Sequence, residues 1–453
     1  MPSPRRWRFF IIAASFVFYA WWDWHFVALL AGSIVGNQLA ALLIYRAPDQ
    51  ATRKGVLAVA VAGNLGALAY FKYYDFFVSS AAQTMERLGI AWVPHIVGVA
   101  LPVGISFFTF MGISYLVDTY RGDFVPVGFS TFAAYLSFFP HLVAGPIVRP
   151  GELIPQFATP RDPRRVDTTR AFALIGGGLF LKVVIANYLA SRIVDEVFAA
   201  PERRSSLEVL VGIYAYAVQI FADFAGYTNI AIGAALLLGF RFPQNFNNPY
   251  TAVSIQDFWR RWHMTLSRWL RDYLYIPLGG SRKGRARTYV NLMLTMLLGG
   301  LWHGASWTFV VWGGIHGTGL VLEHWRHDRR VELGLPEPAD TPLRLWLRRL
   351  VTFNVVCLAW VFFRASSFSD AGAVLGRLFT GWGQPSPLVT TGVLAAIALG
   401  LGIQYVPARL GEKAMGAFSR LSPVLQGVAL GVGLMVVGVM GPEGVAPFIY
   451  FRF

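Results

Sequence analysis

The chain has 453 residues, of which 55% are hydrophobic and only 14% are charged, and its formal net charge is +15. A water-soluble protein of this length needs more polar surface than this composition supplies, because its outside must be hydrated. The composition therefore excludes an ordinary soluble domain. It also argues against a nucleic-acid partner, because the Arg and Lys residues lie mostly between apolar runs, where they hold loops at an anionic membrane surface.

Apolar runs recur along the whole chain, and we expect them to form membrane-spanning helices, each of which needs roughly 20 apolar residues. The run Leu207–Phe240 is too long for one crossing and is expected to make two. The fold class is therefore an all-α polytopic membrane protein with about ten to twelve transmembrane helices. The other predicted spans are Phe9–Trp22, Phe26–Ile44, Gly55–Phe71, Ile96–Val117, Phe129–Val148, Ala171–Leu189, Thr288–Leu301, Ala305–Leu322, Leu350–Phe363, Leu388–Val406 and Leu425–Met440.

The first two runs are flanked by basic clusters at residues 5–8 and 53–54 and are joined by a short turn around Asp23. This pattern predicts a helical hairpin with both ends on the cytoplasmic side. The first run lacks a small-residue cleavage site and is expected to stay in the membrane as an anchor. The single cysteine, Cys357, excludes a disulfide within the chain and is expected to be a small buried hydrophobe.

The segment 245–287 is neither a clean span nor a simple loop. Trp259, Trp262, Leu266 and Trp269 recur at helical spacing, with arginines on the other faces. This combination predicts a helix at the membrane interface, which could be an anchor without chemistry. A basic turn, Arg282–Arg287, follows it.

Three histidines lie in or beside the apolar segments of this region: His263, His303 and His316. An ionisable group at membrane depth is costly and often marks a site, although each ring could also only join neighbouring helices. A metal site is disfavoured because the spacing fits no zinc motif and the nearest carboxylates, Asp257 and Asp272, are few. These residues fit a transporter as well as an enzyme.

Polar residues also interrupt other apolar helices, namely Lys182, Asp223 and Asn229. Lys182 could extend its ammonium group to the interface, and Asp223 could pair with a buried cation. A functional role for them is equally open at this stage.

Several stretches of the sequence resemble the membrane-bound O-acyltransferase family, in particular the branch with alginate O-acetyltransferases and the D-alanyl transfer protein of teichoic acid modification. They occur in the expected order over nearly the whole chain. The most specific are the run DFWRRWHMTLSRWLRDYLYIPLGG within Asn247–Gly280 and the LWHG motif within Leu298–Trp307. The others are SFFPHLVAGPIV at 137–148, FADFAGYTNIAIG at 221–233 and FIYF at 448–451.

The resemblance implies a single membrane-embedded acyltransferase domain over 1–453, with a central tunnel in a bundle of transmembrane and interfacial or re-entrant helices and a catalytic core segment at 245–317. It implies that His303 is catalytic, as a general base, and that His263 is its partner. Substrate contacts are expected from Asn247, Asn248, Asp257, Trp259, Arg260, Trp302 and His316.

The same resemblance implies an acyl donor rather than a bound cofactor. The donor would be acetyl-CoA, another acyl-CoA or an acyl carrier protein, and the basic turn Arg282–Arg287 would suit its phosphates. The acceptor would be a hydroxyl of an exported polysaccharide or envelope polymer at a bacterial inner membrane, reached directly or through a periplasmic transferase.

Two departures from the family pattern bear on these expectations. Ala225 and Asn229 stand where the alginate branch usually has serine and aspartate, so the acceptor is left open. Members also commonly begin with one more hydrophobic helix before the first arginines. The alternatives are a transporter or export subunit, which lacks support because the motif-rich block has no repeat in the first half, and a non-catalytic scaffold.

Overall fold

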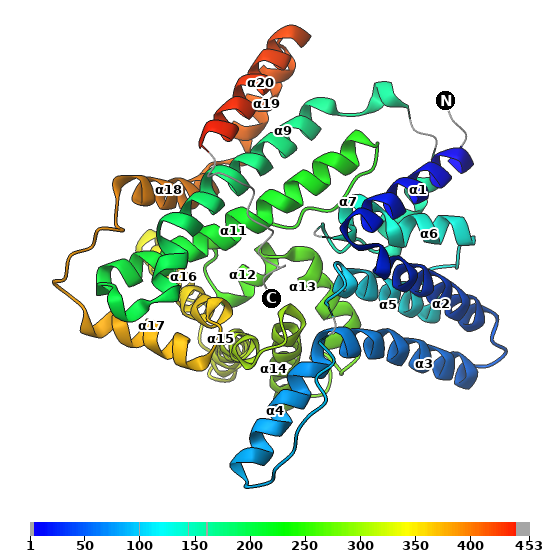
Figure 1. The fold of residues 1–453 in the computed structure, drawn as a ribbon, viewed down its shortest axis with the longest axis horizontal. Coiled ribbons are helices and arrows are strands. Elements are labelled where there is room, and N and C mark those ends of the chain that lie inside the picture. The colour runs from blue at the N-terminus through cyan, green and yellow to red at the C-terminus, as the bar shows by residue number, and fades with distance from the viewer. Residues whose placement is uncertain (1–3, 99, 144, 160–161, 441–453) are drawn as a thin grey trace. The chain divides into compact units, whose positions relative to one another are not determined.

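The computed structural model describes residues 4–98, 100–143, 145–159 and 162–440, and every regular element in these ranges is a helix (Figure 1). The predicted all-α class is therefore confirmed. The terminal FIYF motif lies outside the described residues. The chain divides into two compact units, one formed by residues 1–167 with 234–243 and the other by residues 168–233 with 244–453.

The first unit is built around α2, α3 and α5, which pack against one another. Its helices are α1 (Pro4–Asp23), α2 (Val27–Arg46), α3 (Gln50–Leu68), α4 (Tyr74–Arg87), α5 (Ile105–Arg121), α6 (Phe129–Ser137), α7 (Phe139–Leu142) and α8 (Pro150–Leu153). The break between α1 and α2 falls at the predicted turn, where Asp23 accepts a hydrogen bond from the backbone N–H of His25 at 2.9 Å.

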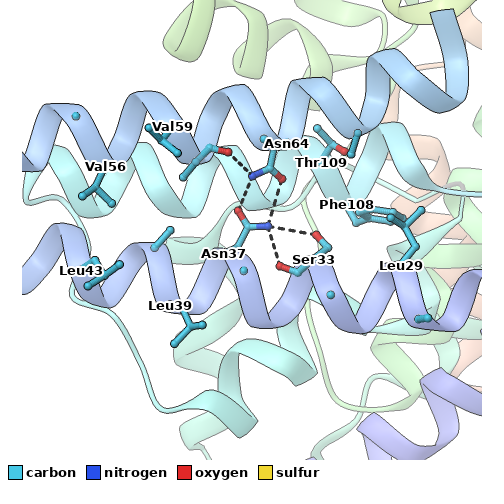
Figure 2. A pocket seen from close by; sticks show the side chains of 18 of the residues that line it. Leu29, Ser33, Asn37, Leu39, Leu43, Val56, Val59, Asn64, Phe108 and Thr109 are labelled. Carbon is cyan, nitrogen blue, oxygen red and sulfur yellow. Dashed lines mark hydrogen bonds between the residues drawn. The ribbon is translucent and has the colours of Figure 1, made fainter. Parts of the chain in front are cut away.

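A pair of asparagines joins α2 to α3 inside the apolar part of this unit (Figure 2). Asn64 Nδ2 donates to Asn37 Oδ1 at 2.9 Å, and Asn37 Nδ2 donates to Asn64 Oδ1 at 3.2 Å. Small and apolar residues of the two helices surround the pair and line a groove of about 950 Å³. Such amide pairs hold helices together where little else polar is available.

The second unit contains all three candidate histidines. Its helices are α9 (Thr168–Leu179), α10 (Asp195–Ala199), α11 (Ser206–Leu237, whose last residues belong to the first unit), α12 (Ile255–Arg261), α13 (Met264–Leu270), α14 (Arg285–His303), α15 (Trp307–Glu332), α16 (Pro342–Arg364), α17 (Phe368–Thr380), α18 (Thr391–Gly402), α19 (Ala408–Ser419) and α20 (Pro423–Met440). Residues Phe180–Asn187, after α9, and Arg271–Tyr275, after α13, continue as π-helix. α14 and α15 form an antiparallel hairpin (Figure 1).

Within the described residues, five helical stretches are long and apolar enough to cross a membrane, or six if a bent pair at residues 391–419 counts as one span. The chain is thus a multi-pass membrane protein, as predicted. The expected number of ten to twelve crossings is not confirmed. The five stretches are Pro4–Arg46, Gln50–Arg87, Thr168–Ala199, Ser206–Leu237 and Pro342–Arg364.

Three predicted spans differ from the observed helices. Leu207–Phe240 does not make two crossings but forms one helix, α11, which has no proline and whose glycines pack against α9 and α10 instead of ending it. In Ile96–Val117 the helix begins only at Ile105, after a proline and a left-handed glycine. Phe129–Val148 breaks after Ser137, where Pro140 lies in the first turn of α7.

The prediction of a single helix at the membrane interface is also wrong. It is split into α12 and α13 at Trp262 and His263. Its tryptophans do not face lipid, since Trp259, Trp262 and Trp269 are only 8%, 1% and 6% exposed. The helical periodicity therefore identifies a face that packs inside the second unit. Cys357 is buried, as predicted.

Candidate active site

His303 is the last residue of α14 and is 3% exposed. The chain turns at Gly304, and α15 begins at Trp307 with Ser306 as its N-cap, whose side chain accepts from the N–H of Thr308 at 3.3 Å. The motif LWHG thus ends one helix, and the following residues start the next. This places the imidazole at the closed end of a helical hairpin.

Two glycines bring α14 and α15 into backbone contact. A Cβ atom on Gly300 would collide with the carbonyl oxygen of Phe309, and one on Gly313 would collide with that of Met296. The close approach leaves the rings of His303 and Trp312 with their centroids 5.0 Å apart. Glycine is required at both positions because any side chain would push the helices apart.

Gly313→Ala is therefore expected to destabilise the protein by about 1–3 kcal/mol and to lower its activity, because the added methyl group has no space. The measurement is thermal unfolding in detergent together with turnover. Gly314→Ala is the matched control, since its new Cβ would lie 3.6 Å from Leu297, an ordinary contact. Equal stability of the two variants would show that the helices can separate without loss.

His263 lies between α12 and α13 and is fully buried. Its backbone adopts a left-handed conformation with φ of 41°, which is uncommon for a residue other than glycine. It lies outside the candidate spans, and burial lowers the pKa of its imidazole to about 3, so the ring is neutral at physiological pH.

Asn245 fixes His263, and the sequence reasoning did not identify it. Its Oδ1 accepts from the backbone N–H of Thr265 at 3.2 Å and lies 3.2 Å from His263 Nδ1. Because that oxygen can only accept, Nδ1 carries the proton and Nε2 keeps its lone pair. Nε2 has no hydrogen-bond partner among the described residues. The ring centroids of His263 and His303 are 6.5 Å apart.

His316 completes the cluster from α15, one turn after Trp312 and fully buried. Trp259 Nε1 donates to His316 Nδ1 at 3.3 Å. The proton of His316 is therefore on Nε2, which has no acceptor within the part of the chain that the structure describes. Trp312 lies between the two histidines, with centroids 5.0 Å from His303 and 4.9 Å from His316.

The position of α12 depends on a carboxylate of α15. Glu323 accepts from the backbone N–H groups of Ile255 and Gln256, at 2.5 Å and 3.0 Å, at the first turn of α12. A carboxylate is favourable there because the unpaired N–H groups carry partial positive charge. Glu323 thus helps to place Trp259 against His316, although nothing in the sequence pattern marked it.

The structure brings some of the predicted site residues together and leaves others apart. His263, His303, His316, Trp259 and Trp302 form one cluster, in which the Trp302 ring lies 5.0 Å from that of His303 and 6.1 Å from that of His263. The remaining four predicted contacts lie elsewhere: Asn247 and Asn248 are exposed, Asp257 binds Arg261 Nε at 2.8 Å, and Arg260 is exposed beside a cavity.

Comparisons with known proteins identify the family to which the chain is related. Residues 114–325, which contain all three histidines, match the profile of the membrane-bound O-acyltransferase family. The chain is 42% identical over 388 residues to a probable alginate O-acetylase of Azotobacter vinelandii, covering 83% of this chain and 74% of that protein. It is 38% identical over 403 residues to a peptidoglycan O-acetyltransferase of Helicobacter pylori, covering 82% and 73%.

A more distant relative, a teichoic acid D-alanyltransferase of Streptococcus thermophilus, is 29% identical over 280 residues, which cover 58% of this chain and 68% of that protein. Identity of about 40% over most of both chains extends well beyond the histidine motifs. This multi-pass membrane protein belongs to the membrane-bound O-acyltransferase family.

Proposed function

We propose that this O-acyltransferase moves an acetyl group from a thioester on the cytoplasmic side to a hydroxyl of an exported polysaccharide or another envelope polymer. The membrane would be the inner membrane of a bacterium. The observation that carries the proposal is the buried cluster of His263, His303 and His316 at the end of the α14–α15 hairpin. Two of the relatives named above, a probable alginate O-acetylase and a peptidoglycan O-acetyltransferase, transfer acetyl groups to such polymers.

In this proposal His303 acts as the general base. Its imidazole takes the proton of the acceptor hydroxyl while the hydroxyl oxygen attacks the thioester carbonyl. The tetrahedral intermediate then collapses, the C–S bond breaks, and the departing thiolate takes the proton from the imidazolium. The products are the acetyl ester and the free thiol, so atoms and charge balance.

The two other histidines would serve different roles because their protons are on different atoms. His316 offers Nε2–H as a donor to the developing oxyanion, whereas His263 offers the lone pair of Nε2. The segment 245–317 would then be the catalytic core of a single acyltransferase domain over 1–453. Neutral rings suit this work, since burial disfavours the charged imidazolium.

The test is reconstitution of the purified protein in liposomes with radiolabelled acetyl-CoA or an acetylated carrier protein. The acceptors are mannuronate oligosaccharide, glycan strands and teichoic acid, each with and without a periplasmic transferase. We expect base-labile label on a glycan hydroxyl. Two results would contradict the proposal: labelling of an acceptor only when the donor carries D-alanine, and no labelling with any combination of donor and acceptor.

A further inference from the structure

A cavity of about 430 Å³ lies beside the histidine cluster in the second unit. Elements α12, α13, α14 and α15 surround it, and they lie close together (Figure 1). Trp259 connects the two features, because its ring lines the cavity and its Nε1 donates to His316. The cavity is therefore one aromatic side chain away from the proposed catalytic centre.

The charged groups that line this cavity are cationic: Arg260, Arg268 and Arg271 are among the lining residues, with no carboxylate. The nearby carboxylates are engaged, since Glu323 accepts from two backbone N–H groups of α12 and Asp272 pairs with Arg271 at 2.6 Å. The cavity therefore favours an anion.

Arg260 is the guanidinium in this cavity that is available to a ligand. It is exposed and makes no hydrogen bond or ion pair with any described residue. An unpaired guanidinium beside a cavity suits phosphate, which accepts two parallel hydrogen bonds from it. In the basic turn, by contrast, Arg285 is already paired with Glu332 and Asp328.

The distance from the cavity to the histidines fits a long thiol arm. Met296 lines the cavity and His303 ends the same helix seven residues later, which is roughly 10 Å at about 1.5 Å per residue. An extended phosphopantetheine arm covers this length with its phosphate at one end and its sulfur at the other. The phosphate could stay at the cavity while the thioester reaches the cluster.

We infer that Arg260 binds the phosphate of the phosphopantetheine arm of the acyl donor in this cavity, with Arg268 as a second cation. This inference rests on the proposed function. The basic turn Arg282–Arg287 is the alternative phosphate site, and Arg282→Gln tests it. Both CoA and a carrier protein present this phosphate, so the same arginine would serve either donor.

The test measures equilibrium binding without turnover, in phospholipid-free non-ionic detergent, for CoA, 4′-phosphopantetheine and pantetheine. Arg260→Gln is expected to raise the Kd for CoA and for phosphopantetheine about tenfold and to leave that for pantetheine unchanged, because only the first two carry phosphate. Arg260→Lys should recover part of the loss. Arg326→Gln is the matched control, since Arg326 is exposed on α15 and lines a different groove.

Several outcomes would overturn the inference. The first is an unchanged Kd for CoA in Arg260→Gln, and the second is an equal rise in the Kd for pantetheine. The others are a rise in Kd for CoA but not for phosphopantetheine, and a rise caused by Arg282→Gln instead of Arg260→Gln. A wild-type protein that binds CoA through Arg260 and yet transfers no acetyl group would support this site and contradict the proposed function.

Discussion

His303→Ala is expected to lower kcat for acetyl transfer by about 10²–10⁴-fold, which is the usual contribution of a positioned general base. The acceptor hydroxyl would then have to lose its proton without help while it attacks the thioester. The effect should fall on kcat rather than on the KM of the donor, because the imidazole acts on the acceptor proton and does not hold the donor. The measurement is steady-state transfer by the reconstituted protein.

Removing a buried ring can also disturb folding. His303→Gln, which keeps most of the side-chain volume, should therefore be measured together with His303→Ala. His327→Ala is the matched control, because His327 is an exposed histidine of α15. Wild-type turnover in His303→Gln with an unchanged melting temperature would remove His303 from the mechanism.

Lys182→Met is expected to destabilise the protein by about 3–5 kcal/mol, because it removes the cation that pairs with the buried carboxylate of Asp223. Lys182 and Asp223 form an ion pair between the π-helix that follows α9 and the helix α11, and their side chains are only 5% and 3% exposed. Neither charged group can reach water easily. When one of them is removed, water therefore cannot solvate the charge that stays behind. Unfolding in mixed detergent micelles measures the change in free energy.

The double variant Lys182→Met with Asp223→Leu separates loss of charge balance from loss of packing. Replacing both members of a buried pair by apolar residues is often close to neutral, so the double variant should recover most of the stability. A double variant as unstable as Lys182→Met alone would show that the loss of packing, rather than the loss of charge balance, causes the destabilisation. The double-variant cycle gives the coupling between the two side chains directly.

The position of His303 could be predicted from the sequence because local residues determine it. Gly304 ends α14 and Ser306 caps α15, so the residues that follow His303 determine the turn between the two helices. The family resemblance also paired His303 with His263, and the two rings do lie in one cluster. The local sequence and the family resemblance were therefore enough to predict that His303 and His263 belong to the candidate site.

The supporting residues could not be predicted, because they depend on contacts between distant segments. Asn245 precedes His263 by 18 residues and contacts it only because the intervening helix α12 returns the chain. Glu323 reaches α12 from 67 and 68 residues away. Periodicity likewise could not tell a lipid-facing tryptophan stripe from a buried one, since both need the same spacing.

The left-handed backbone at position 263 places a costly conformation on a fully buried residue. An L-amino acid with a side chain is strained there by about 1–3 kcal/mol, whereas glycine adopts the same φ of 41° without that penalty. His263→Gly would relieve that strain, but it would also leave a cavity where a fully buried ring now packs. Under the proposed mechanism it would remove one of the three clustered imidazoles as well.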